Sequence, residues 1–298
     1  LCTPGERVVA ARETANGAVA EILHADGTRS ERACDILVAA DGIHSALRQQ
    51  FYPDEGAPRW NGMMMWRGTT LARPFLDGRT MVQAGHRRAK FVVYPIEPVR
   101  PDGLQRINWI CDRRLREDGF GGGLTAPSRE DWSKPGSLDD LLPTFGSWRF
   151  AWLDVPGLIR AAEQILEWPM VDRDPLPRWR HGHTTLLGDA AHPMYPIGSN
   201  GATQAILDAA ALADALDGHA SITAALNAYE AARLPMTRDI VAMNRREGLD
   251  AILDMVEEAA PEGFARIEDV TDPTVLAEWV QAYKKAAGHQ VGRPQSAP

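Results

Sequence analysis

The stretch from Thr184 to Ala202 constrains the fold of this chain more than any other, because it joins a strand, a tight turn and the start of a long helix. Its first four residues are threonines and leucines, a β-branched and apolar run that is typical of a strand buried on both faces. Gly188 permits the sharp turn that follows. Ligands of α/β folds bind at the edge where such strands end, so we expect Asp189 to stand at a ligand-binding edge.

The loop and helix after this turn predict a second ligand-binding element. Pro193 and Pro196 stiffen the loop, and the Gly198–Gly201 segment supplies flexible backbone and an N-cap. The helix repeats small and apolar residues at steps of three and four. This pattern predicts a packed face of Ala202, Ala205, Ile206, Ala209, Leu212, Ala213 and Leu216. The free N–H groups at the helix start favour an electron-rich carbonyl or an anionic ring.

A second strand with a polar end lies near the N-terminus. Residues 36–40 form a continuous apolar run that predicts a buried strand, and Asp41 and Gly42 end it. A helix opens after the turn and carries Arg48. Taken alone, this pattern fits an ordinary solvated turn as well as it fits a ligand site.

The middle of the chain has a different character, with frequent proline, glycine, tryptophan and arginine. Alternating patterns predict strands at residues 63–70, 80–84, 90–96 and 106–111. We therefore expect an α/β (α+β) fold in which a mainly antiparallel sheet interrupts a Rossmann-like domain and helices follow. The expected boundaries are 1–51 and 180–298 for the two parts of the interrupted domain and 52–179 for the inserted sheet.

Composition excludes several classes of protein. The 298 residues carry a net charge of −8 without a basic cluster, so nucleic acid is not an expected partner. No run of 18 apolar residues occurs, so no membrane span is expected. The three cysteines lack C-x-x-C spacing, which favours a reducing, cytoplasmic location. His181 and His183 have no supporting cluster of ligands, so no metal site is expected.

The run from Thr184 to Ala202, with Gly-Asp-Ala-Ala-His at its turn, resembles the second FAD-binding motif of the group A flavoprotein aromatic hydroxylases, the para-hydroxybenzoate hydroxylase-like family. The Asp41-Gly42 turn with Arg48 resembles another signature of this family, which contacts the pyrophosphate region of FAD and is implicated in NAD(P)H use. The Trp-Arg-Gly sequence at residues 66–68 and the Tyr-Pro pair at 94–95 resemble the salicylate and phenazine hydroxylase branch.

This resemblance implies roles for individual residues. Asp189 would bind the ribityl chain of the flavin, the N–H groups of Asn200 and Gly201 would face its pyrimidine edge, and Pro196 would lie beside its ring. The implied cofactor-binding residues are Asp41, Gly42, Arg48, Gly188, Asp189, Pro196, Gly198, Asn200 and Gly201. Trp66, Tyr94 and Tyr195 are candidates for the walls of a substrate pocket, although core packing explains Trp66 equally well. No catalytic residue can be assigned.

The function implied by the resemblance is that of an FAD-dependent monooxygenase. It would use NAD(P)H and O2 to hydroxylate a small phenolic or carboxylated aromatic compound. A homodimer is compatible with this function.

The family also has an N-terminal G-x-G-x-x-G motif that binds the FAD pyrophosphate, and no such motif occurs in this chain. We therefore expect the chain to be the C-terminal part of a longer enzyme that lacks the N-terminal FAD-binding segment. A truncation, an incomplete gene sequence or a separate N-terminal chain would look the same.

Three alternatives stay open at this point. A flavin-dependent oxidoreductase without hydroxylation would share both motifs, and an inactive pseudo-domain would explain the absent dinucleotide motif. A hydrolase that uses Asp189 and His192 is the third, but the chain has no G-x-S-x-G turn to supply a nucleophile.

Overall fold

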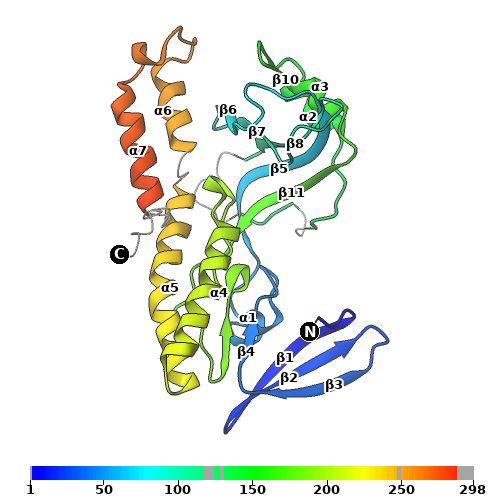
Figure 1. Ribbon diagram of the computed structural model, residues 1–298, viewed down its shortest axis with the longest axis vertical. Coiled ribbons are helices and arrows are strands. Elements are labelled where there is room, and N and C mark those ends of the chain that lie inside the picture. The colour runs from blue at the N-terminus through cyan, green and yellow to red at the C-terminus, as the bar shows by residue number, and fades with distance from the viewer. Residues whose placement is uncertain (1, 117–123, 128–130, 247–249, 287–298) are drawn as a thin grey trace. The chain divides into compact units, whose positions relative to one another are not determined.

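The structure is a computed structural model that describes residues 2–116, 124–127, 131–246 and 250–286. The chain forms two compact units (Figure 1). Unit 1 comprises Leu1–Arg59, Asp172–Leu249 and Thr274–Pro298, and unit 2 comprises Trp60–Val171 and Asp250–Pro273.

Unit 1 begins with a small antiparallel sheet of three strands, β1 (Glu6–Thr14), β2 (Gly17–His24) and β3 (Arg29–Cys34). The Asn-Gly sequence at residues 16–17 makes the tight turn between the first two strands, where Thr14 pairs with Gly17.

The two buried strands predicted from the sequence form one parallel pair. β4 (Leu37–Ala39) lies beside β12 (Thr184–Leu186), with Leu37 opposite Thr184. The helix α1 (Ala46–Phe51) follows β4, and a single 3-10 turn, η2 (Gly188–Ala190), follows β12. Since the strands run in the same direction, their carboxyl ends lie at the same edge of the sheet.

Two long helices, α4 (Gly201–Gly218) and α5 (Ile222–Arg245), lie side by side in unit 1 (Figure 1). Leu186 on β12 is fully buried beneath them, and its carbonyl accepts a hydrogen bond of 3.1 Å from the hydroxyl of Tyr229 on α5. The core around it also contains Leu47, Trp179 and Leu212.

The packed face predicted for α4 is wrong. Of the predicted residues Leu212 is buried, but Ile206 is 70% exposed and Leu216 is 37% exposed, and the other buried residues of α4 are Gln204, Asp208 and Ala215. The physical reason is a buried network of polar side chains that Gln204 and Asp208 form with α5, described below. Hydrogen bonds and ion pairs compensate the burial of these two residues, and the alanine-rich face is turned to solvent.

The centre of unit 2 is a sheet of five strands in the order β11–β5–β8–β7–β6 (Figure 1). The strands are β5 (Arg59–Ala72), β6 (Val82–His86), β7 (Ala89–Pro95), β8 (Gln105–Arg114) and β11 (Ile165–Asp172). The pairs β5–β8, β8–β7 and β7–β6 are antiparallel. Each of the four strands predicted between residues 63 and 111 overlaps one of these strands.

Two short helices cover one face of this sheet, which we call the helix-covered face. α2 (Leu138–Phe145) brings the ring of Phe145 to 6.4 Å from that of Phe91. α3 (Val155–Arg160) supplies the carbonyl of Leu158, which accepts a hydrogen bond of 2.7 Å from Thr70. Successive side chains of a strand alternate between faces. The opposite face, which we call the second face, therefore carries Arg67, Thr69, Tyr94 and Asn108.

The remaining elements are short or lie near the C-terminus. They are the strand pair β9 (Arg149–Phe150) and β10 (Leu153–Asp154), the helices α6 (Ala251–Ala259) and α7 (Pro273–Ala286), and the 3-10 turns η3 (Ile197–Ser199) and η5 (Ile267–Asp269). This combination of helices, a parallel strand pair and a mainly antiparallel sheet confirms the predicted fold class. Within the described ranges, none of the helices has the length and hydropathy that a membrane span requires.

Candidate functional site

The two sequence motifs meet at one edge of the parallel strand pair in unit 1. Asp41 and Gly42 follow β4, and Gly188 and Asp189 follow β12. The N–H of Leu187 donates to the carbonyl of Ala39 over 2.9 Å, which ties the two strand ends together. Gly188 has a φ of 60°, a conformation that glycine adopts without the steric cost of a side chain.

Asp189 presents a free carboxylate at this edge. Its side chain is exposed, and none of the described residues donates a hydrogen bond to it. A Cβ atom placed on Gly201 would lie 3.9 Å from Asp189 Oδ1, so the carboxylate lies beside the first residue of α4. A free acceptor next to the N–H groups of a helix start can bind a ligand that has hydroxyl groups and an electron-rich or anionic part.

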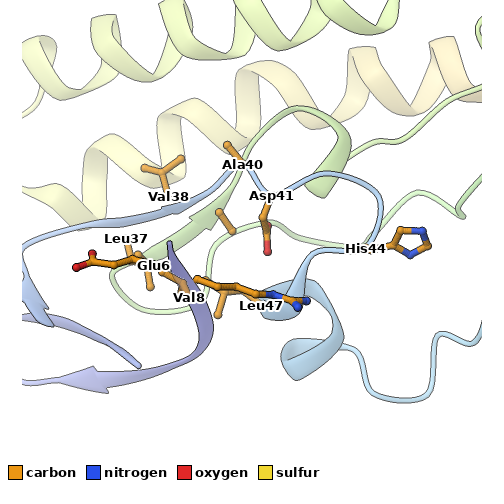
Figure 2. A pocket seen from close by; sticks show the side chains of 10 residues that line it. Glu6, Val8, Leu37, Val38, Ala40, Asp41, His44 and Leu47 are labelled. Carbon is orange, nitrogen blue, oxygen red and sulfur yellow. The ribbon is translucent and has the colours of Figure 1, made fainter. Parts of the chain in front are cut away.

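Asp41 is partly used by the protein itself. Its Oδ2 accepts a hydrogen bond of 2.8 Å from the N–H of Ala46 at the start of α1. Asp41 also lines a pocket of about 480 Å³ in unit 1 (Figure 2). The other lining residues are Glu6, Arg7, Val8, Leu37, Val38, Ala39, Ala40, His44 and Leu47.

Arg48 is buried, and all of its side-chain donors are engaged. Nη1 donates to the carbonyls of Ala190 and Ala191 over 3.0 and 2.9 Å, and Nη2 donates to the carbonyl of Asp174 over 2.9 Å. Nε and Nη2 also bind the carboxylate of Glu55. Arg48 therefore clamps the Gly-Asp-Ala-Ala-His turn to α1. The direct cofactor contact that the resemblance implied for it would require one of these bonds to break.

The loop before α4 has an unusual backbone. Gly198 has a φ of 73° and Ser199 a φ of 56°, so the chain turns sharply after Pro196 and before the buried Asn200. Tyr195 is 1% exposed, and the amide of Asn244 donates to its carbonyl over 3.0 Å. Burial and the nearby Asp172 raise the pKa of the Tyr195 phenol, so it is neutral at physiological pH.

A buried polar network beneath the turn was missed in the sequence. Asp208 on α4 is fully buried, and its Oδ2 accepts from the N–H of Gly188 over 3.1 Å and lies 2.5 Å from His192 Nε2. Its Oδ1 accepts from Arg233 Nε over 2.7 Å, and Arg233 Nη2 donates to Gln204 Oε1 over 2.6 Å. Burial alone would raise the pKa of Asp208, but these hydrogen bonds outweigh burial and lower it. The network holds Gly188 in place, and thereby orients Asp189.

A signal for this network is present in the sequence. Gln204 and Asp208 are four residues apart, which places them on the same face of a helix. Their alanine-rich surroundings made them look like the solvent-facing side of that helix.

The candidate substrate residues of unit 2 lie on opposite faces of its sheet. Trp66 is 3% exposed on the helix-covered face, where its Nε1 donates to Glu167 Oε2 over 2.9 Å and the guanidinium of Arg113 lies 5.4 Å from its ring. Tyr94 lies on the second face, directly opposite Asn108 in the register of β7 and β8. These contacts give Trp66 a packing role within unit 2, and a role in substrate binding stays a prediction for both residues and for Tyr195.

Comparisons with known proteins agree with these motifs. A protein family described as "FAD binding domain" matches residues 156–244. The phenazine 1,6-dicarboxylic acid hydroxylase PhzS of Lysobacter antibioticus is 48% identical over 211 residues, which cover 70% of this chain and 50% of that protein. The chain belongs to the family of FAD-dependent aromatic hydroxylases.

Other members of the aromatic hydroxylase family are similar over comparable lengths. The 3-amino-4-hydroxybenzoate 2-monooxygenase PtmB3 of Streptomyces platensis is 37% identical over 229 residues, which cover 75% of this chain and 52% of that protein. The chain thus spans about half the length of these curated relatives. A solved structure of a salicylate hydroxylase substrate complex has the same fold, with a TM-score of 0.65, 24% identity, and coverage of 98% of this chain and 72% of the solved chain.

Proposed function

We propose that the protein is an FAD-dependent monooxygenase that uses NAD(P)H and O2 to hydroxylate a small phenolic or carboxylated aromatic compound. The observation that carries this proposal is the free carboxylate of Asp189 beside the start of α4, within the segment that matches an FAD binding domain. The named substrates of the two curated relatives are a phenazine dicarboxylic acid and an aminohydroxybenzoate, both aromatic acids, which supports this substrate class.

The residues of unit 1 fit the cofactor that this family uses. The Asp189 carboxylate can accept hydrogen bonds from the hydroxyls of a ribityl chain, because no described residue occupies it. The N–H of Gly201 at the start of α4 can donate to the electron-rich edge of a flavin, a role that the resemblance implies for Asn200 as well, and Gly188, Gly198 and Pro196 shape the turns around them. Asp41, Gly42 and Arg48 support the adjacent strand end. When bound, FAD supplies the redox chemistry and the activation of oxygen.

The proposal can be tested on the protein purified with all of the sequence that its gene encodes on either side of residues 1–298. We expect a yellow protein with a flavin spectrum, and NADH or NADPH oxidation that rises when an aromatic acid is added. A panel of hydroxybenzoates and phenazine carboxylic acids covers the substrate class. A protein that takes up no flavin in reconstitution would contradict the cofactor assignment.

The same assay separates the proposed activity from that of a flavin oxidoreductase without hydroxylation. Such an enzyme would oxidise NAD(P)H at a rate that no aromatic compound stimulates, and it would release no oxygenated product. An inactive pseudo-domain would not oxidise NAD(P)H. The two curated relatives, one named as a hydroxylase and the other as a monooxygenase, favour the hydroxylase over both.

Two further expectations from the sequence belong to this proposal. We infer a cytoplasmic location, which is supported by the free thiols of Cys2, Cys34 and Cys111, and a homodimer stays compatible with the proposed function. Cell fractionation tests the first, and light scattering of the purified protein tests the second.

A further inference from the structure

Arg67 is an exposed arginine in the middle of a sheet whose neighbouring residues are buried. Met65 and Trp66 before it on β5 are 4% and 3% exposed. Among the described residues, its side chain has one hydrogen-bond partner, Asn108 Oδ1, at 2.6 Å from Nε, and no carboxylate pairs with it. The two terminal nitrogens of the guanidinium therefore remain available, and its positive charge is not neutralised within the described part of the chain.

Asn108 adds a second free donor to the second face. Its side chain is fully buried, yet Nδ2 has no hydrogen-bond partner in the described structure. An arginine Nε can only donate, so the atom of Asn108 that faces it must be the acceptor Oδ1. This fixes the orientation of the amide and leaves Nδ2 as a donor. Buried donors without an acceptor are rare in folded proteins, and each requires an explanation.

Arg67 and Asn108 offer hydrogen-bond donors, and no carboxylate of the described residues pairs with Arg67, so an anionic acceptor would complete this cluster. A guanidinium with free terminal nitrogens binds a carboxylate through two parallel hydrogen bonds, and Nδ2 of Asn108 can donate to the same anion. Tyr94 lies directly opposite Asn108 and adjoins the cluster on the second face.

We propose that Arg67 and Asn108 bind the carboxylate of the aromatic substrate on the second face of the unit 2 sheet. This inference rests on the proposed function and narrows its substrate class to aromatic carboxylic acids rather than neutral phenols. Arg67 and Asn108 are then determinants of specificity, because a substrate without the carboxylate leaves both groups without a partner.

The test compares acids with their amides, which keep the ring and lose the charge. The probes are salicylate with salicylamide and phenazine-1-carboxylic acid with phenazine-1-carboxamide, titrated calorimetrically into the flavin-loaded protein expressed with all of its encoded sequence. We expect the wild type to prefer the acids. Arg67→Gln should weaken acid binding about 10- to 100-fold and leave amide binding unchanged. Arg79→Gln, an exposed arginine in a turn of the same unit, removes the same charge elsewhere and should change neither.

A second variant guards against a structural effect of losing Arg67. Asn108→Asp places a carboxylate beside Nε, which neutralises Arg67 within the protein and repels an incoming anion. Acid binding should fall, amide binding should persist, and the circular dichroism spectrum should match that of the wild type. Arg67→Lys keeps the charge but cannot form two parallel hydrogen bonds to a carboxylate, so it should give an intermediate affinity for acids.

The inference is overturned if the wild type binds none of the acids, if Arg67→Gln leaves acid binding unchanged, or if acids and amides weaken equally. Product analysis keeps this separate from the proposed function. If oxygenated product forms but acids and amides bind equally well, the carboxylate site at Arg67 is wrong and the proposed hydroxylase activity stands. If acids bind more tightly than amides but no oxygenated product forms, the carboxylate site stands and the proposed hydroxylase activity is wrong.

Discussion

Asp189 is the residue on which cofactor binding is expected to depend most. Its carboxylate is free of partners among the described residues and lies beside Gly201. We predict that Asp189→Ala weakens FAD binding about 10- to 100-fold, since a charged acceptor contributes about 1.5–3 kcal/mol per hydrogen bond. Flavin fluorescence titration of the apoprotein measures this. Asp214→Ala on the exposed side of α4 is the matched control; equal affinities for FAD in all three proteins would exclude Asp189 from the cofactor site.

Asp208 binds the N–H of Gly188, next to Asp189, and replacing Asp208 should lower the free energy of unfolding. Asp208→Asn removes a charge that is bound by Arg233, His192 and Gly188, and leaves the buried guanidinium of Arg233 without a carboxylate to neutralise it. Breaking a buried ion pair in this way costs about 3–5 kcal/mol, and we predict a decrease of this size in the free energy of unfolding at pH 7. Urea titration followed by circular dichroism provides the value.

The pH dependence of this loss follows from the direction of the pKa shift. Folding lowers the pKa of Asp208 below its ordinary value of 3.8. Its contribution to stability is therefore fully present above that value and is lost as the pH falls below it. The difference between wild type and Asp208→Asn should stay constant above pH 3.8 and shrink as the pH falls below it. A difference that stays constant as the pH falls below 3.8 would mean that the charge of Asp208 contributes nothing.

For individual residues, the sequence predicted where they lie in the fold but not which hydrogen bonds they form. Asp41 and Asp189 were predicted at strand ends, because a buried apolar run and a glycine mark such an end without any knowledge of the fold. Arg48 was predicted near the cofactor, but its engagement with Glu55 and the carbonyls of Ala190 and Ala191 depends on residues far away in the chain. No local pattern contains that information.

At the scale of elements, α4 shows how a buried polar network overrides an apolar pattern. Its exposed side carries Ile206, Leu207 and Leu216, with exposures of 70%, 37% and 37%. An apolar surface of this kind binds hydrophobic dyes. We predict that residues 1–298 expressed alone enhance the fluorescence of anilinonaphthalene sulfonate, and that the double variant Ile206→Gln, Leu216→Gln reduces the enhancement without lowering the melting temperature.

A control for α4 is available in unit 2. Met81 is 51% exposed, and Met81→Gln should leave the dye signal nearly unchanged. If the α4 double variant lowered the melting temperature by several degrees while the dye signal stayed the same, the α4 residues would be packed rather than exposed.

A second element-level feature is a buried lysine that ties α6 to the sheet of unit 2. Lys90 on β7 lies 3.1 Å from Asp112 on β8 and also pairs with Asp250, the residue before α6. Burial opposes the charge of Lys90, but the two carboxylates outweigh burial and raise its pKa.

We predict that Lys90→Met destabilises the protein by about 3–5 kcal/mol, because Asp112 is left buried and unpaired. Adding Asp112→Leu to Lys90→Met should restore much of the loss, since an apolar pair of similar volume needs no partner. Chemical denaturation of both variants measures this. A double variant that is less stable than Lys90→Met would show that the pair is not the source of the effect.

For the whole molecule, the fold class and the family followed from the sequence, whereas the contact between Arg67 and Asn108 on the second face of unit 2 did not. The strand, the turn and the helix start between Thr184 and Ala202 are consecutive in the chain, so their pattern can be recognised in a single sequence. Arg67 and Asn108 are distant in sequence and meet only through the register of β5 and β8, with Thr69 opposite Asn108. Strand pairing of this kind cannot be deduced from a single sequence.

The central claim is that the protein transfers an oxygen atom from O2 to an aromatic acid. The most direct measurement is mass spectrometry of the products formed with NAD(P)H under isotopically labelled O2, by the protein carrying all of its encoded sequence. We predict a product that has gained one oxygen atom, with the label in that atom. Hydroxylated product that carries unlabelled oxygen from water, or NAD(P)H oxidation that yields only labelled hydrogen peroxide, would contradict the claim.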